Sequence, residues 1–194
     1  MANKSIYDFS AETLDGQLVP LCNYRGKVLL IVNVYHRLNA LMEMFGDLNF
    51  TVLGFSCNQF GLQSPEVNHE TLNVLKYVRP GGGFEPKFPV FAKVEVNGLN
   101  EEPLFTYLKE SLPFVNPVIG DLRKFYWSPI KVNDIRWNFE RFLITADGVL
   151  IRLHSSSQVR TSLSHGNGGE GHRRAAHLNC LQCVGQSGRV TIPR

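Results

Sequence analysis

Short strand-like runs alternate with helix-like segments along most of this 194-residue chain. Residues 28–34, VLLIVNV, and residues 51–57, TVLGFSC, are nearly continuous apolar runs, as in strands that are covered on both faces. Between them, residues 36–45 place apolar side chains at helical spacing and stop at Gly46. Strands that alternate with helices predict an α/β domain, in which helices are layered over a sheet.

The same alternation continues to residue 153. Ser64 and Pro65 are suited to begin a helix that ends before Pro80 and three glycines. Three further elements are expected from periodicity and turn residues: a strand at 88–96, a helix over 104–112, and a hairpin of 139–145 with 148–154 across Asp147-Gly148.

The segment 154–194 differs in composition from the rest. None of the 13 Phe, 6 Tyr and 2 Trp lies beyond Phe142, and neither a helical nor a strand period runs through this segment. It therefore cannot bury enough apolar surface to offset the entropy lost on ordering. We predict one domain at 1–153 and a disordered tail at 154–194.

Charge is distributed unevenly between these two parts. The first 153 residues carry 15 Lys and Arg against 16 Asp and Glu, whereas the tail carries five Arg and one Glu. A basic tail can bind nucleic acid or anionic lipid, but these arginines lack aromatic partners, which favours a solvated tail and no nucleic-acid partner. No apolar run approaches the roughly 20 residues of a membrane span, and the first residues contain no apolar signal-peptide core. We expect a cytoplasmic protein without a membrane segment.

The four cysteines follow no spacing typical of a disulfide framework, so we expect reduced thiols. Cys180 and Cys183 form a Cys-x-x-Cys pair. Redox pairs of this spacing open a helix after a strand, whereas this pair lies in the unpatterned tail. We therefore expect neither a redox centre nor a metal site there.

One junction departs from the regular pattern. The strand at 28–34 runs directly into the helix that begins near Tyr35, whereas βα connections usually take about 2 to 6 residues. Asn33 would cap the helix if the strand ended at Val32, so the local sequence is compatible with a deletion and with a short connection. The junction matters because open α/β sheets place their chemistry at the C-terminal ends of central strands.

The stretch GFSCNQFGLQ, residues 54–63, has a structural and a functional interpretation. In the structural one, Cys57 is a small core residue, and Asn58 and Gln59 serve a turn. The same stretch, however, resembles a signature of the glutathione peroxidases. Further motifs match that family in the same order: IYDFSAETLDGQ at the start, YRGKVLLIVNV before the junction, LKYVRPGGGFEP at 75–86, EVNG at 95–98, WSP at 127–129 and DIRWNFERFLITADG at 134–148. The resemblance runs from about Ile6 to Arg152.

The resemblance implies a thioredoxin-like fold, in which helices flank a central mixed sheet. It also implies the reduction of hydroperoxides, with glutathione as the reducing co-substrate and no other cofactor. In this family a selenocysteine or cysteine at the start of the helix after the first long strand attacks the peroxide. Two thiols then return it to its reduced state.

Roles for particular residues follow from the same resemblance. Gln63 would give an amide donor to the attacking anion, Trp137 an indole N–H, and Asn138 a further amide. Taken alone, Trp137 is equally consistent with a core aromatic whose N–H is satisfied. Arg79 and Arg152 resemble positions that hold the carboxylates of glutathione, although either is also consistent with a surface charge.

Two departures from the family bear on activity. Between Val34 and Tyr35 the family has roughly eight more residues, about a βα connection plus a first helical turn, and these carry the nucleophile. From His154 onward the chain shares nothing with the last helix of the family. We therefore expect a peroxidase that is inactive for want of its nucleophile; the alternative is a non-catalytic splice variant or binding protein of the same fold. KYVRPGGGF resembles the longer members, which predicts soluble hydroperoxides as substrates and a homotetramer if the C-terminus were intact.

Overall fold

The computed structural model describes residues 4–33, 38–113, 121–138 and 140–153. The chain separates into two compact units, Met1–Arg152 and Leu153–Arg194, and nearly all described residues belong to the first. The predicted tail at 154–194 lies outside the described residues. So does the junction between Val34 and Tyr35. Both stay predictions.

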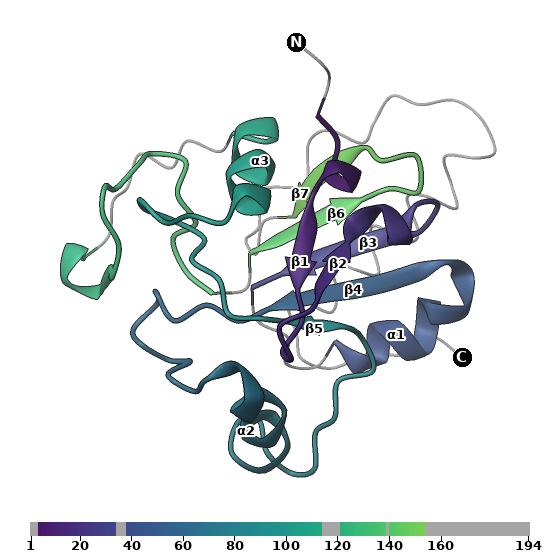
Figure 1. The fold of residues 1–194 in the computed structure, drawn as a ribbon, viewed down its shortest axis with the longest axis horizontal. Coiled ribbons are helices and arrows are strands. Elements are labelled where there is room, and N and C mark those ends of the chain that lie inside the picture. The colour runs from purple at the N-terminus through teal and green to yellow at the C-terminus, as the bar shows by residue number, and fades with distance from the viewer. Residues whose placement is uncertain (1–3, 34–37, 114–120, 139, 154–194) are drawn as a thin grey trace, which may run out of the picture. The chain divides into compact units, whose positions relative to one another are not determined.

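A five-stranded sheet forms the centre of the first unit, in the order β5-β4-β3-β6-β7 (Figure 1). The middle strand, β3 (Val28–Val32), pairs in parallel with β4 (Phe50–Phe55) and antiparallel with β6 (Arg141–Ile144). Beyond them, β5 (Val90–Phe91) pairs in parallel with β4, and β7 (Leu150–Leu153) lies next to β6. The sheet is mixed, as the resemblance predicted.

The two long apolar runs form the two most buried strands. Residues 29–32 of β3 and all of β4 are buried, so both faces of these strands are covered. Leu29 and Ile31 join the buried residues of α3 (Pro103–Ser111) in one cluster. Leu30 and Val32 point to the opposite face of the sheet, because side chains alternate along a strand. Helix α1 (Asn39–Phe45) packs against β4 (Figure 1).

The helix predicted from Ser64 begins later than expected. The backbone N–H of Ser64 donates to Asn58 Oδ1 at 2.9 Å, which holds this residue in the preceding loop. A 3-10 turn at Asn68–Glu70 comes first, and α2 (Thr71–Tyr77) follows it. The prediction of a helix ending before Pro80 is right, and its starting point is wrong.

The strand predicted at 88–96 is also shorter than expected. Only Val90 and Phe91 pair with β4, opposite Gly54 and Phe55. After Phe91 the backbone leaves the sheet, because its N–H groups find other acceptors: Ala92 donates to the Glu12 carbonyl, Val94 to the Ser56 carbonyl, and Val96 and Asn97 to the Gln59 side chain. These contacts reappear at the site described below.

Other elements are short. The hairpin of β6 and β7 is present, with Thr145 N–H donating to the Val149 carbonyl at 2.9 Å and Gly148 at φ 84°. A second hairpin of β1 (Ser10–Glu12) and β2 (Leu18–Pro20) was not predicted, because three-residue strands are too short to show a period. The remaining 3-10 turns are Ile6–Asp8, Leu21–Tyr24, Gly46–Leu48 and Leu122–Lys124.

Candidate functional site

The central strand ends beside the segment that carries two of the predicted donors. Asn33 follows β3 directly and is only 1% exposed. Its Nδ2 donates to the backbone carbonyl of Trp137 at 3.5 Å. Its Oδ1 is buried and accepts no hydrogen bond from the described residues. In the sequence, an asparagine within the apolar run 28–34 was the signal that could have indicated a buried polar residue at Asn33 and not only a helix cap.

Gln63, Trp137 and Asn138 come together, although Gln63 is far from the other two in sequence. Asn138 Nδ2 donates to Gln63 Oε1 at 3.1 Å. Gly61 lies between the other pair: a Cβ at this position would stand 3.6 Å from Trp137 Cη2 and 3.8 Å from Gln63 Cγ. These are ordinary van der Waals distances, and Gly61 is favoured at this position by its φ of 63°, which side chains rarely adopt.

The two tryptophans occupy contrasting environments. Trp127 is 9% exposed, and its Nε1 donates to Asp134 Oδ2 at 2.9 Å, as expected for a core aromatic. Trp137 is 40% exposed, and none of the described residues accepts a hydrogen bond from its Nε1. The buried Phe60 ring lies 5.5 Å from the Trp127 ring and 6.0 Å from the Trp137 ring. Trp137 therefore rests on the core through Phe60 and keeps its N–H available.

The loop that carries Gln63 is held by its own amides. Asn58 Oδ1 accepts from Ser64, and the buried Gln59 side chain binds the backbone of Val96 and Asn97. The structural interpretation of Asn58 and Gln59 as turn residues is in keeping with these contacts. They place Gln63 at a defined position beyond the end of β4.

Cys57 is not placed to act as a nucleophile. Its side chain is buried, and its Sγ donates to Gln59 Oε1 at 3.6 Å. Burial raises the pKa of the Cys57 thiol to about 11, so the thiol stays protonated at neutral pH. The other described cysteine, Cys22, is exposed. Cys180 and Cys183 lie outside the described residues.

The two predicted carboxylate-binding arginines are not brought into this cluster. Arg79 follows α2 and is exposed, and its backbone N–H donates to the Val74 carbonyl. No contact among the described residues joins Arg79 to Gln63, Trp137 or Asn138. Arg152 belongs to β7, and its side chain lies outside what the structure describes.

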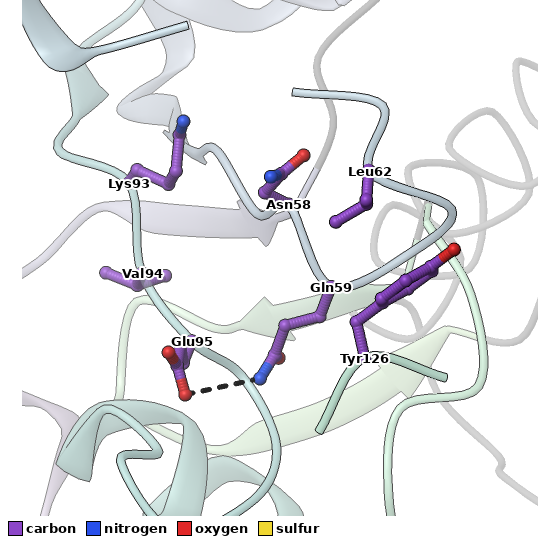
Figure 2. Close-up of a pocket in the computed structure, with 7 residues that line it drawn as sticks. All are labelled: Asn58, Gln59, Leu62, Lys93, Val94, Glu95 and Tyr126. Carbon is purple, nitrogen blue, oxygen red and sulfur yellow. Dashed lines mark hydrogen bonds between the residues drawn. The ribbon is translucent and has the colours of Figure 1, made fainter. Parts of the chain in front are cut away.

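A cavity of about 310 Å³ lies beside the loop that carries Gln63 (Figure 2). Among its lining residues, Gln59 and Glu95 point toward each other, with Gln59 Nε2 at 3.4 Å from Glu95 Oε2. The full lining is Asn58, Gln59, Leu62, Lys93, Val94, Glu95 and Tyr126. Because Gln63, Trp137 and Asn138 do not line it, the predicted donors and this cavity are separate features.

Within the part of the chain that the structure describes, no three or more His, Cys, Asp or Glu side chains are grouped so as to hold a metal ion. Among the same residues, no helix has both the length and the apolar character needed to cross a membrane.

Comparison with known proteins identifies the family. The family model described as Glutathione peroxidase matches residues 6–109. Glutathione peroxidase 3 of Pongo pygmaeus is 45% identical over 166 residues, which cover 80% of this chain and 74% of that protein. The chain belongs to the glutathione peroxidase family. Two further members are similar: Glutathione peroxidase of Dirofilaria immitis, 47% identical with 83% and 78% covered, and Glutathione peroxidase 6 of Rattus norvegicus, 48% identical with 80% and 76% covered.

Solved structures of this family have the same fold. The crystal structure of Trgpx in apo form matches with a TM-score of 0.52 and 28% identity, covering 80% of this chain and 89% of that one. The crystal structure of T. cruzi GPX1 matches with a TM-score of 0.54 and 29% identity, covering 78% and 86%. The predicted α/β thioredoxin-like fold is confirmed. By family the protein is a peroxidase, an oxidoreductase whose substrates are a hydroperoxide and glutathione.

The alignment with the Pongo glutathione peroxidase is longer than the part of this chain that it covers. It runs over 166 positions but covers 80% of the 194 residues, which is about 155 residues. About eleven positions of that relative therefore have no counterpart in this glutathione peroxidase. The size of this difference is similar to that of the loop that the resemblance places between Val34 and Tyr35.

Proposed function

We propose that this chain is a glutathione peroxidase that retains the donors of the active site and lacks the nucleophile, so that it does not turn over hydroperoxides. One observation carries the proposal: Gln63, Trp137 and Asn138 converge where β3 ends. The six residues between β3 and α1 read Asn-Val-Tyr-His-Arg-Leu and contain no cysteine.

The donors alone cannot perform the reaction. Amide and indole N–H groups stabilise a negative charge that develops on an attacking atom. In a covalent mechanism, however, the attacking atom forms the bond to the peroxide oxygen, and its removal eliminates the pathway. Cys57 does not replace it, because its thiol is buried and its pKa is raised to about 11.

An activity assay tests this proposal. In a coupled assay with glutathione and hydrogen peroxide, we expect no turnover by the full chain above the background reaction of its thiols. The Cys57→Ser variant should give the same background, since Cys57 is buried. Turnover that persists in Cys57→Ser would refute the missing nucleophile.

The alternative is a splice variant of the same fold that binds thiols or partners without catalysis. The buried core and the donors are consistent with a folded protein of this kind. Genomic DNA between the codons for Val34 and Tyr35 distinguishes the two. An in-frame TGA codon flanked by Ala-Ser and Gly codons would favour a selenocysteine peroxidase, and its absence the non-catalytic variant.

Assembly and location form a further part of the proposal. Helix α2 and the residue after it expose large apolar side chains: Leu72, Tyr77 and Val78. Tyr77 and Val78 belong to the KYVRPGGGF motif that resembles the longer members, and we assign this surface to a homotetramer in a chain with a family-like C-terminus. Soluble hydroperoxides as substrates, a cytoplasmic location and the absence of a cofactor beyond glutathione belong to the same proposal.

A further inference from the structure

Asn97 lies at a turn that touches both donor-bearing segments. It belongs to the EVNG motif at 95–98, which follows β5, and its side chain is fully buried. A fully buried amide is costly unless its donors and acceptors are paired. Every polar group of Asn97 has a partner, and these partners come from two distant parts of the chain.

The backbone of Asn97 binds the loop that carries Gln63. Gln59 Oε1 accepts from the Val96 and Asn97 N–H groups at 3.0 and 3.1 Å, and Gln59 Nε2 donates to the Asn97 carbonyl at 2.8 Å. Gln59 precedes Gln63 by one short turn, which Asn58 closes through Ser64. The turn at Asn97 therefore determines where this loop sits.

The side chain of Asn97 binds the segment that carries Trp137 and Asn138. Asn97 Nδ2 donates to the Ile135 carbonyl at 2.8 Å, and Asn97 Oδ1 accepts from the Ile135 N–H at 3.0 Å. Ile135 is fully buried and precedes Trp137 by two residues. One asparagine thus joins both segments, which meet again where Asn138 donates to Gln63.

The buried Lys109 of α3 fixes the orientation of the Asn97 side chain. Lys109 is 1% exposed, and its Nζ donates to Asn97 Oδ1 at 3.0 Å and to the Val96 carbonyl at 2.8 Å. Two buried carboxylates form ion pairs with it: Glu101 at 2.6 Å and Asp134 at 3.4 Å. Asp134 also accepts from Trp127 Nε1 and from the Lys131 N–H. Asp134 therefore connects Trp127 and Lys131 to the same ammonium group.

We propose that Asn97 is a positioning residue for the Gln63, Trp137 and Asn138 donors, and that Lys109 holds Asn97 in the orientation this requires. The inference rests on the proposed role of these donors. Asn97 acts through Gln59 on one side and Ile135 on the other, and it contacts no reacting atom. Its effect is to set the separation between the two donor-bearing segments.

The contact between Asn138 and Gln63 provides the readout. In ¹H–¹⁵N spectra of the full chain, the Asn138 side-chain amide is assigned by its loss in Asn138→Asp. Its protons should show nuclear Overhauser effects to the Gln63 side chain. Asn97→Ala should abolish these effects and move the amide signals to the position of a free asparagine. The backbone signals of β3 and β4 should persist, which shows that the sheet remains folded.

A matched control is available on the surface. Asn39 spans two backbone groups in the same way, with Nδ2 donating to the Glu85 carbonyl at 2.7 Å and Oδ1 accepting from the Lys87 N–H at 2.9 Å. Asn39→Ala should leave the Asn138 signals unchanged. Lys109→Arg, which retains the charge and several donors, should preserve them, and Lys109→Met should not.

Unchanged Asn138 signals in a folded Asn97→Ala variant would overturn the proposal. Where Asn97→Ala does not fold, Asn97→Asp decides. It keeps the acceptor for Ile135 and Lys109, replaces the Nδ2 donor by an oxygen that repels the Ile135 carbonyl, and places its added charge against the Lys109 ammonium. Weaker Overhauser effects in Asn97→Asp support the proposal, and unchanged ones overturn it. The readout needs no turnover, so a failure of the peroxidase proposal and a failure of this one remain distinguishable.

Discussion

At the scale of single residues, burial decides which thiol could react. Cys57 lies two residues beyond the end of β4 and belongs to a signature motif, and these two facts alone would make it a candidate nucleophile. Its buried position excludes that role, because desolvation penalises the thiolate and raises its pKa to about 11. A sequence motif records the type of residue at a position but does not record whether water reaches it.

The raised pKa of Cys57 predicts how stability depends on pH. The unfolded chain loses the thiol proton near the ordinary pKa of about 8.5, whereas the folded chain keeps it until about pH 11. Between these values the unfolded state binds fewer protons, so the free energy of unfolding falls as pH rises. The fall should approach about 1.4 kcal/mol per pH unit from this group alone.

Urea unfolding at pH 7, 9 and 10 measures this effect. Cys57→Ala serves as the reference, because it carries every other titrating group. The stability advantage of the native chain over Cys57→Ala should shrink as pH rises. A constant difference across this range would show that the Cys57 thiol titrates equally in both states.

At the scale of elements, we expect the connection from β3 to α1 to govern activity. We expect that inserting Ala-Ser-Tyr-Cys-Gly-Leu-Thr between Val34 and Tyr35 gives the strand an ordinary connection and supplies a thiol at the start of a helix. The thiolate would then stand within reach of Gln63 and Trp137, and partial peroxidase activity should appear in the coupled assay. The insertion belongs in a chain with a family-like C-terminus, so that misfolding is not mistaken for inactivity.

The restored activity should depend on the indole N–H. Trp137→Phe keeps an aromatic ring against Phe60 and deletes the donor, and loss of one preorganised donor costs on the order of 10²-fold in rate. Tyr126→Phe removes an exposed hydroxyl from the neighbouring cavity and should leave the rate unchanged. Equal rates with and without the Trp137 N–H would remove Trp137 from the donor set.

Elements also show how far the sequence predicts this structure. β3, β4, α3 and the β6–β7 hairpin were predictable, because long apolar runs, a helical period and a Gly turn signal them directly. The true end of β5 and the start of α2 were not. After β5 the backbone N–H groups of Ala92 and Val94 bind the Glu12 and Ser56 carbonyls, and before α2 the Ser64 N–H binds the Asn58 side chain. Such pairings leave no local period in the sequence. The same is true of the hydrogen bonds between Asn97 and Ile135, which lie beside the donor-bearing segment.

At the scale of the whole molecule, the exposed apolar side chains of α2 bear on assembly. Tyr77 is 70% exposed, and Val78 beside it is similarly accessible. When residues 154–194 are replaced by a family-like C-terminus, light scattering should report a tetramer, and Tyr77→Asp should shift it toward a monomer because a buried interface does not accommodate an unpaired charge. Tyr126→Asp, at another exposed tyrosine, should not. A tetramer that survives Tyr77→Asp would place the interface elsewhere.

The difference between the two tryptophans gives the molecule a pair of optical reporters. Trp127 and Trp137 are the only tryptophans in the chain, so all of its indole fluorescence comes from these two rings. The Trp127 ring is buried, and the Trp137 ring is exposed to solvent. Emission from Trp127 reports on the integrity of the core, and emission from Trp137 reports on what occupies the surface above Gln63. A soluble quencher such as acrylamide reaches the second ring and spares the first. Binding of a small molecule beside Trp137 can therefore be followed in the unmodified chain, without a label and without any chemical turnover.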